Sequence, residues 1–483
     1  MGRRARHARG GNVSAGRRVV VIGGGLAGIA AALDCAAAGA SVTLVEVRRR
    51  LGGAAYSFER EGLRMDNGQH VFLRCCTAYR TLLARLGSEP LTAVQPRLEI
   101  PVLKPGSPPT VLRRGSLAAP LHLAGALARY PHLSRLERAG AARAALGLMR
   151  IDPDDGALDE TSFGDWLARH GQSRRAIAAL WDLIALPTLN VPAAQASLGL
   201  AAFVFRTGLL AGADAGDIGF HESTLGETIG VPAERALAGA GVETRLGWRA
   251  ERVQRTGDGL EVHGGADGLS AQAVVIALPH TRSATLLEPL LGERAAALRG
   301  LGRSPIVNLH VVYDRPVCEE PFAAGVGTPV QYLFDRTRAA GAPAGCQYLA
   351  VSLSGAEREM GMSVDALRER YLPALRELLP RARSAKLELF LATREHAATF
   401  RGVPGTAALR PRPRTGVPGL VLAGAWTATG WPATLESAVL SGHAAAGAVL
   451  QELGIDPVDA RAGAPTARLA AGSPKESSGA LVR

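Results

Sequence analysis

The sequence contains few cysteines and no apolar run long enough to cross a membrane. Its stretch VVVIGGGLAGIAAAL at residues 19–33 is shorter than the roughly 20 residues that a span requires, and glycines interrupt it. The cysteines are scattered and odd in number, so their spacing fits neither a disulfide framework nor a metal site. They are Cys35, Cys75, Cys76, Cys318 and Cys346. We therefore expect a protein of the reducing cytoplasm without a metal centre.

Lysine is also scarce, because nearly all the positive charge is arginine. The chain has three lysines and a formal net charge of +12, and six arginines lie in the first 18 residues, where no acid balances them. Residues 1–15 are predicted to form a disordered, solvated arm, with an anionic membrane surface as the alternative partner. The arm lacks the apolar segment of a secretory signal. No basic stripe with interleaved aromatic residues occurs, so a nucleic-acid partner is not expected.

Length and composition predict a soluble globular protein with a large core. The chain has 483 residues, of which 47% are hydrophobic and 20% charged, and it contains 58 glycines. This length corresponds to two large domains or to three smaller ones. The many glycines indicate numerous tight turns.

The first residues after the arm predict a strand, a glycine turn, a helix and a second strand. RRVVVIGGG at residues 17–25 contains a short β-branched run of the kind that is buried on both faces of a sheet. LAGIAAALDCAAAGA is rich in alanine and favours a helix, and SVTLVEV is a second buried strand. Gly23, Gly25 and Gly28 form the pattern GxGxxG within this unit, and Glu46 ends the second strand.

This arrangement predicts a dinucleotide-binding site. The glycines allow a tight turn, a close approach of the backbone to a diphosphate and close packing of the helix. An acid about twenty residues later binds ribose hydroxyls. The N-terminus of the helix adds a positive field that holds the diphosphate. The spacing alone leaves NAD and FAD both open.

A second glycine turn follows the acid closely and carries a family resemblance. EVRRRLGGAAYSF contains Arg48, Arg50, Gly52 and Gly53, and residues 19–58 resemble the FAD-binding N-terminus of the amine oxidase and phytoene desaturase superfamily. The resemblance implies FAD as the cofactor, with these four residues in its site. The chain departs from the family pattern at Ala54, where an arginine is common, so that contact is either missing or made elsewhere.

The C-terminal part of the chain has the same resemblance. LVLAGAWTATGWPATLESAVLSG at residues 420–442 predicts a strand, a turn at Gly424, a second turn and a helix that opens near Pro432. In the similar family the N-terminus of this helix points at the flavin, so Gly424, Trp431, Pro432, Ala433 and Thr434 are implied cofactor contacts. Here Ala425 stands where the superfamily has an acid.

The resemblance also implies the domain organisation. ALAGAGVETRLGWRAERVQRTGDGLEVHGGADGLSAQAVVIALPH is similar to the family segment whose backbone, here at about Val253, contacts adenine. We predict an α/β protein of two domains, of the amine oxidase type. A discontinuous Rossmann-like FAD domain comprises residues 16–98, 220–285 and 410–452. An interleaved mixed substrate domain comprises residues 99–219 and 286–409, and residues 453–483 form a disordered tail.

The stretch DNGQHVF at residues 66–72 alone reads as a turn. From residue 17 to about residue 450 the chain resembles the hydroxysqualene dehydroxylases. Three segments carry this resemblance: DNGQHVFLRCCTAYRTLLARLG, WDLIALPTLNVPAAQASL and LAGAWTATGWPATLESAVLSG. That family places the stretch across the flavin ring, so Gly68 is expected to admit the backbone close to the ring. Gln69 and His70 are expected at the boundary between flavin and substrate.

The resemblance implies the reductive removal of the hydroxyl of hydroxysqualene, which gives squalene in hopanoid biosynthesis. The hydroxyl is allylic, so its departure with a proton leaves a delocalised cation that can take a hydride from reduced FAD. His70 is the candidate proton donor, because its ordinary pKa lies near neutrality, and Asp66 is the second. Alternatively, His70 orients the flavin and Asp66 stabilises the turn.

Two other functions are compatible with the same motifs. A carotenoid desaturase or an amine oxidase would use this cofactor oxidatively, and a prenyl-lipid binding protein of the same fold would lack flavin chemistry. No second nicotinamide motif is evident, so the electron donor is expected to be a partner reductase or free reduced flavin. The apolar run at 196–205 and the helices expected at 121–149 fit a core, the wall of an isoprenoid tunnel or a peripheral membrane face.

Overall fold

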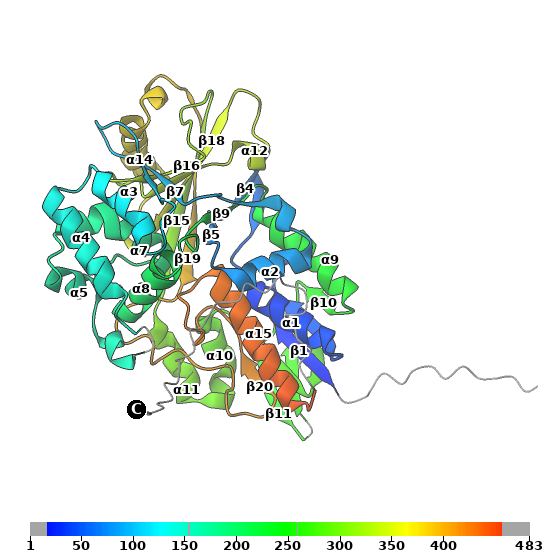
Figure 1. Cartoon of the computed structure of the whole chain (residues 1–483). Helices are drawn as coiled ribbons and strands as arrows, with labels where there is room; N and C mark the ends of the chain where they lie inside the picture. Colours follow the sequence, from blue (N-terminus) through cyan, green and yellow to red (C-terminus); the bar gives the residue numbers. More distant parts are fainter. Residues whose placement is uncertain (1–16, 153–154, 258, 456–483) are drawn as a thin grey trace, which may run out of the picture.

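The computed structural model describes residues 17–152, 155–257 and 259–455 (Figure 1). The predicted N-terminal arm and residues 456–483 of the predicted tail lie outside the described residues. Within the described ranges, no helix combines the length and the apolar character that crossing a bilayer would need.

A parallel sheet of five strands is assembled from distant parts of the chain. Its order is β10-β2-β1-β14-β20, and every neighbouring pair is parallel. The strands are β1 (Arg18–Ile22), β2 (Ser41–Glu46), β10 (Glu243–Leu246), β14 (Ala273–Ile276) and β20 (Leu420–Leu422). The apolar run of β1 is buried on both faces, as expected for a parallel sheet that is covered on each side.

The two faces of this sheet are covered by different elements. Val19, Val21 and Leu44 pack with the helices α1 (Leu26–Ala37), α2 (Thr77–Leu86), α9 (Val231–Gly239) and α15 (Leu435–Glu452). The alternate residues Val20 and Ile22 face the opposite core. This second face is shared with the antiparallel strands β11 (Arg252–Thr256), β12 (Gly259–Gly264) and β13 (Asp267–Ala271), and with α10 (His280–Leu291) and α11 (Glu293–Ala296).

A second sheet of seven strands lies at the other end of the molecule (Figure 1). Its order is β19-β15-β18-β17-β16-β7-β8. The strands are β7 (Glu99–Leu103), β8 (Thr110–Arg113), β15 (Ser304–Tyr313), β16 (Phe322–Gly325), β17 (Tyr332–Asp335), β18 (Gln347–Ser354) and β19 (Leu387–Thr399). All pairs are antiparallel except β16 with β7.

The alternation of β15 decides which of its side chains can reach the site. Val307, Leu309 and Val311 pack on one face against α14 (Val364–Leu378). Successive side chains of a strand point to opposite faces, so Asn308 and His310 point away from α14. The short helices α12 (Thr337–Ala340) and α13 (Glu357–Met360) connect strands of this sheet.

Two small sheets join the large ones. The hairpin β3 (Ser57–Arg60) and β4 (Leu63–Asp66) precedes the DNGQH stretch. After it, β5 (Phe72–Leu73) pairs with β9 (Ile218–His221), and β9 pairs with β6 (Thr92–Val94). Helices form a separate layer, at the left of Figure 1. They are α3 (Ala124–Arg129), α4 (Arg135–Leu148), α5 (Phe163–Arg169), α6 (Arg174–Ala176), α7 (Asp182–Leu189) and α8 (Leu198–Phe205).

One boundary differs from the expectation drawn from the sequence. The final helix was expected to open near Pro432, but α15 begins at Leu435. Thr434 is its N-cap residue, and the Thr434 hydroxyl accepts a hydrogen bond from the Ser437 amide at 3.2 Å. A threonine cap is strongly favoured at this position, so Pro432 lies in the turn that precedes the helix.

Candidate cofactor and substrate site

The glycine turn between β1 and α1 has a backbone that side chains would disrupt. Gly23 has a φ of +113°, and a Cβ there would lie 2.4 Å from the carbonyl oxygen of Ala277. A Cβ on Gly28 would lie 1.9 Å from the carbonyl oxygen of Gly23. Gly25 is the N-cap residue of α1. The turn therefore presents bare backbone at the positive end of a helix, as diphosphate binding requires.

Glu46 closes the same turn from the end of β2. One carboxylate oxygen accepts a hydrogen bond from the Gly24 amide at 2.7 Å, and the other accepts one from the Arg48 amide at 2.7 Å. The Trp248 amide, beyond β10, donates to the Glu46 carbonyl at 2.9 Å. The indole N–H of Trp248 is buried and has no partner among the described residues. Glu46 thus lies at the carboxyl edge of the sheet, where nucleotides bind in such folds.

The second glycine turn packs directly on the first. Gly52 has a φ of +100°, and its amide donates to the Gly24 carbonyl at 2.9 Å. A Cβ on Gly53 would lie 2.7 Å from the Cα of Gly25. Arg50 donates to the Gly53 carbonyl at 3.2 Å. Its guanidinium lies 3.7 Å from the centre of the Tyr56 ring, so Arg50 is the cation that accompanies this turn.

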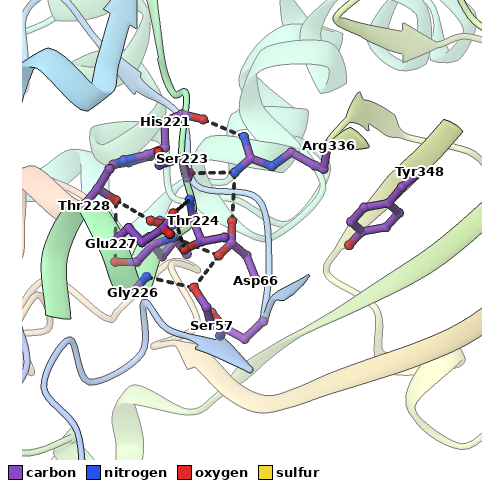
Figure 2. A network of polar contacts seen from close by, with 12 residues as sticks. Ser57, Asp66, His221, Ser223, Thr224, Gly226, Glu227, Thr228, Arg336 and Tyr348 are labelled. Atoms are coloured by element: carbon purple, nitrogen blue, oxygen red, sulfur yellow. Dashed lines mark hydrogen bonds and ion pairs between the residues drawn. The ribbon is translucent and has the colours of Figure 1, made fainter. Parts of the chain in front are cut away.

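Asp66 anchors the start of the DNGQH stretch (Figure 2). One of its oxygens accepts hydrogen bonds from the Ser57 hydroxyl at 2.6 Å and the Leu225 amide at 2.8 Å. The other forms an ion pair with Arg336 at 3.0 Å. Arg336 also donates to the carbonyl of His221 at 2.6 Å. Asp66 is 4% exposed, and burial raises the pKa of its carboxyl group.

Asn67 is held by its side chain. Its amide nitrogen donates at 2.9 Å both to the Ala54 carbonyl and to the Glu395 carboxylate on β19. Its amide oxygen accepts from the Tyr56 amide at 3.1 Å. Ala54, which replaces the family arginine, therefore contributes its backbone to this contact.

The Asn67 carbonyl is fixed from the seven-stranded sheet. It accepts hydrogen bonds from the Asn308 amide nitrogen at 2.9 Å and from the Thr393 hydroxyl at 3.0 Å. Since Thr393 donates to Asn67, its oxygen accepts from Nε2 of His310 at 3.0 Å. Nδ1 of His310 then accepts from the Tyr348 hydroxyl at 2.6 Å. Burial lowers the pKa of His310 to about 4, so the ring is neutral and its proton lies on Nε2.

Unpartnered polar atoms gather next to Gly68. A Cβ on Gly68 would lie 3.0 Å from the Asn308 amide nitrogen. The amide oxygen of Asn308 is buried and has no hydrogen-bond partner in the described chain, and the same holds for the amide nitrogen of Gln69. Such groups are costly to bury alone. They indicate a ligand with hydrogen-bonding groups at this point.

The half-buried His70 lies close to the buried His221. Burial lowers the pKa of His70 to about 4, so its ring is neutral at pH 7. His70 makes no hydrogen bond within the described ranges. The pKa of His221 is lowered to about 3 by burial and by the charge of nearby His70. Nε2 of His221 lies 3.2 Å from the Tyr79 hydroxyl, while its Nδ1 is unpartnered among the described residues.

A buried arginine supports the C-terminal turn. Arg410 is 8% exposed and donates to the carbonyls of Thr427 at 2.5 Å and Trp431 at 2.7 Å, with longer contacts to those of Ala425 and Trp426 at 3.4 Å. Burial lowers its pKa to about 10. The turn that leads to α15 is therefore held together by one guanidinium that donates to several of its carbonyls.

The turn begins at Gly424 and connects to the rest of the site. Gly424 has a φ of +140°, and its amide donates to the Ser441 hydroxyl at 2.8 Å. Glu436, in the first turn of α15, accepts hydrogen bonds from the amides of Ala78 at 3.0 Å and Tyr79 at 2.7 Å. This carboxylate thus caps α2, whose first turn has unpaired amides.

Apolar helices reach this turn from the other side. Within the apolar run at 196–205, Leu198–Phe205 form α8, and most of the side chains of this helix are buried with those of α5 and α7. Phe203 is the half-buried exception, and its ring meets that of Trp431 edge to face at 5.0 Å. Apolar surface is therefore continuous from the helical layer to the C-terminal turn.

The structure brings most of the residues expected from the sequence to this region, and it adds others. Val253 is buried on β11, opposite Val262. The sequence analysis did not single out the following contributors: Trp248, Asn308, His310, Arg336, Thr393, Glu395, Arg410 and Glu436. The pattern VNLHVVY, with polar residues at alternating positions 308 and 310 of a strand, was a usable signal for two of them. Nothing in PRPRTG and its neighbours distinguishes Arg410.

The chain is similar to several known proteins. The sequence model of the flavin containing amine oxidoreductases matches residues 26–450. Hydroxysqualene dehydroxylase of Rhodopseudomonas palustris is 32% identical over 90% of this chain and 98% of its own length. Zeta-carotene desaturase of Zea mays is 32% identical over 34% of this chain and 31% of its own length. A putrescine oxidase variant superimposes with a TM-score of 0.69 at 19% identity, covering 90% of this chain and 99% of that one, which supports the fold alone.

Proposed function

Because this chain belongs to the flavin-containing amine oxidoreductases and is similar from end to end to hydroxysqualene dehydroxylases, we propose that it converts hydroxysqualene to squalene. It is an FAD-dependent oxidoreductase, and the reaction removes the allylic hydroxyl reductively. The observation that carries the proposal is the extent of the likeness. The dehydroxylase match is 32% identical over 90% of the chain, whereas the zeta-carotene desaturase match reaches that identity over 34% only, and a phytoene desaturase match over 90% of the chain falls to 24% identity.

The residues present fit FAD. The two glycine turns pack so closely that side chains would clash, and the buried indole N–H of Trp248 and the buried amide nitrogen of Gln69 lack partners in the part of the chain that is described. We propose that Gly23, Gly25 and Gly28 bind the diphosphate and that Glu46 binds ribose. Gly52, Gly53 and Arg50 would contact the part of the cofactor between its diphosphate and its flavin ring.

The remaining predicted contacts belong to the flavin ring. We propose that Gly68 and Gln69 lie on one side of it, and that the turn from Gly424 to Thr434 directs α15 toward it. Reduced FAD supplies the hydride in this chemistry. The chain itself has to hold the substrate, protonate the departing hydroxyl and exclude water.

For protonation we propose His70 rather than Asp66. Both oxygens of Asp66 already accept hydrogen bonds or an ion pair, whereas the His70 ring is free of partners within the described residues. The pKa of His70 is lowered to about 4, so at pH 7 its neutral N–H donates a hydrogen bond to the hydroxyl. The proton that leaves with the hydroxyl comes from the imidazolium form, whose fraction grows as the pH falls. Asn308 would accept from the same hydroxyl through its unpartnered oxygen.

The electron donor and the cellular setting complete the proposal. We propose that a reductase or free reduced flavin supplies electrons, since the sequence holds no second nicotinamide motif. The expected substrate has thirty carbons and dissolves in the bilayer, so we place the protein in the cytoplasm with an anionic membrane surface as a peripheral partner.

The test starts with the visible spectrum of the purified protein and its anaerobic reduction, followed by addition of hydroxysqualene. We expect the bands of oxidised flavin to return as squalene appears, and squalene itself, as the control, to leave the reduced spectrum unchanged. Reduced flavin that survives hydroxysqualene would contradict the proposal. Bleaching of the oxidised protein by a carotene would instead support a desaturase.

A further inference from the structure

Exposed apolar side chains gather on one surface of the helical layer. Of the ten large hydrophobic residues that are exposed in the described chain, five lie between residues 111 and 146. They are Val111 on β8, Leu117 and Leu121 before α3, and Leu136 and Leu146 on α4. Helix α3 contacts both β8 and α4. We call this surface, together with Arg129, Arg135 and Arg143, the α3–α4 face; α3 and α4 lie at the left of Figure 1.

The outward side of helix α4 is apolar and basic, unlike that of an ordinary surface helix. Its inward side packs through Ala141, Ala144 and Leu148. Its outward stripe carries arginine, leucine and alanine and no acid: Arg135, Leu136, Ala139, Ala142, Arg143 and Leu146. Leu136 is 87% exposed. A solvated helix usually shows mixed charges on its outer side, whereas a leucine and arginine surface is typical of a helix that lies at a lipid interface.

The charge of this surface is positive and mostly unpaired. Residues 111–150 contain seven arginines and a single acid, Glu137, and two of these arginines, Arg113 and Arg114, pair with Glu99 and Asp217. That acid is already bound by Arg175 and by the Ser173 hydroxyl. Arg129, Arg135 and Arg143 form no ion pair within the described ranges. The face is thus complementary to an anionic surface, and each arginine near such a lipid surface adds to the attraction.

A cavity opens on the same face between β8 and α3. It has a volume of about 290 Å³ and is lined by Thr110, Val111, Arg113, Ala126, Arg129, Tyr130 and Pro131. The hydroxyl of Tyr130 donates to the Ala179 carbonyl at 2.6 Å, just before α7. Behind it, the apolar layer continues through α8 to the contact between Phe203 and Trp431.

We propose that the α3–α4 face docks this protein on the surface of an anionic phospholipid bilayer. The arginines meet the lipid phosphates, and Leu117, Leu121, Leu136 and Leu146 enter the interface. The inference deepens the proposed function, on which its purpose rests, because docking here places the apolar layer between the bilayer and the C-terminal turn. A hydrocarbon substrate could then pass from lipid to site without crossing water.

The test measures the partition of the full-length chain to vesicles by flotation. The probes are vesicles of phosphatidylcholine alone and of phosphatidylcholine with about one third phosphatidylglycerol. We expect the anionic vesicles to bind at least about tenfold more protein at low salt. The variant R135Q/R143Q should lose about tenfold or more of that binding. L136S/L146S should weaken binding at every salt concentration, because it removes apolar contact.

The matched control is V364S/R368Q on α14, which changes one exposed apolar residue and one exposed arginine outside the α3–α4 face. It should bind vesicles within about twofold of the unmodified chain, because it leaves the face intact. The six arginines of residues 1–18 are present in every variant, so differences between variants do not come from them. Equal binding by all variants would overturn the proposal. So would a self-association that L136S/L146S abolishes without any vesicle binding, which would make a second copy the occupant. The assay uses no substrate, so its result stands whether or not hydroxysqualene is turned over.

Discussion

Asn308 donates one hydrogen bond and leaves its amide oxygen unpartnered in the described chain. The donor side holds the Asn67 carbonyl, and the free oxygen lies against Gly68. Replacement by leucine keeps the volume but removes both polar functions. We expect N308L to lower the rate at which hydroxysqualene reoxidises the reduced enzyme by about ten- to a hundredfold, the cost of one or two buried hydrogen bonds.

The affinity for FAD serves as the internal control for Asn308. The proposed FAD contacts of the diphosphate and ribose lie in the other sheet, so titration with FAD should give a dissociation constant within about threefold of the unmodified value. A large loss of FAD with unchanged chemistry in the loaded fraction would contradict the role proposed for this residue. Single-turnover absorbance traces separate the two cases.

His310 gives the stability a predictable pH dependence. Its folded pKa of about 4 lies below the ordinary value of 6.5, so the unfolded chain binds a proton between these values that the folded chain does not. Stability is therefore lost as the pH falls from 6.5 toward 4. At pH 5 this one group accounts for about 2 kcal/mol relative to pH 7. Urea unfolding measures the free energy of unfolding at pH 7 and at pH 5. The loss of this free energy between the two pH values should be smaller in H310Q than in the unmodified chain by that amount.

A control for His310 must keep the other histidines of the site. His70 and His221 also have lowered pKa values, so they too make the folded chain less stable as the pH falls. Only the difference in pH dependence between the variants is therefore informative. The exposed His396, on β19, is a suitable comparison. If H396Q flattened the pH dependence as much as H310Q, the assignment to the buried ring would fail.

At the scale of the element, the C-terminal turn depends on Arg410. We expect R410M to leave the Trp431 carbonyl without its donor and the Thr427 carbonyl with the Thr429 amide alone, and to displace the turn that precedes α15. The dissociation constant for FAD should rise about a hundredfold, and R410K should recover part of it, because one ammonium can satisfy only some of these carbonyls. Fluorescence titration of the apoprotein with FAD measures both variants.

The surface arginine Arg412, two residues along the chain, provides the matched change. R412M should bind FAD as the unmodified chain does. If R410M and R412M bound FAD equally weakly, the loss of affinity would be a general effect of charge and not the loss of the hydrogen bonds that support the turn.

Elements were predictable from the sequence where local pattern determines them. The β-branched run of β1, the glycine turn and the alanine-rich α1 follow from residues that neighbour one another, and so does the strand that leads into Asp66. The start of α15 was placed about three residues early, because Pro432 is a good first helical residue and the competing cap at Thr434 depends on a hydrogen bond to Ser437.

The second half of the site could not be predicted in the same way. Arg336 reaches Asp66 across 270 residues of chain, and Asn308 reaches Asn67 across 241. Such pairs depend on how two sheets are placed together, which no local pattern reports. The alternation in β15 shows that Asn308 and His310 share a face, but not what that face meets. The predicted domain boundaries stay predictions, and the one at residue 285 falls inside α10.

The whole molecule offers the last prediction, because the proposed cofactor contacts are spread over the parallel sheet, the DNGQH stretch and the C-terminal turn. A ligand that binds only the folded chain stabilises it by mass action, by about 2.7 kcal/mol at a hundred times its dissociation constant. Removal of FAD should therefore lower the melting temperature by several degrees, and added FAD should restore it in proportion to the logarithm of its concentration. The R410M variant should need about a hundredfold more FAD for the same shift. A melting temperature that ignores FAD would contradict the cofactor site and favour a lipid-binding protein of the same fold, for which an isoprenoid alone would supply the stabilisation.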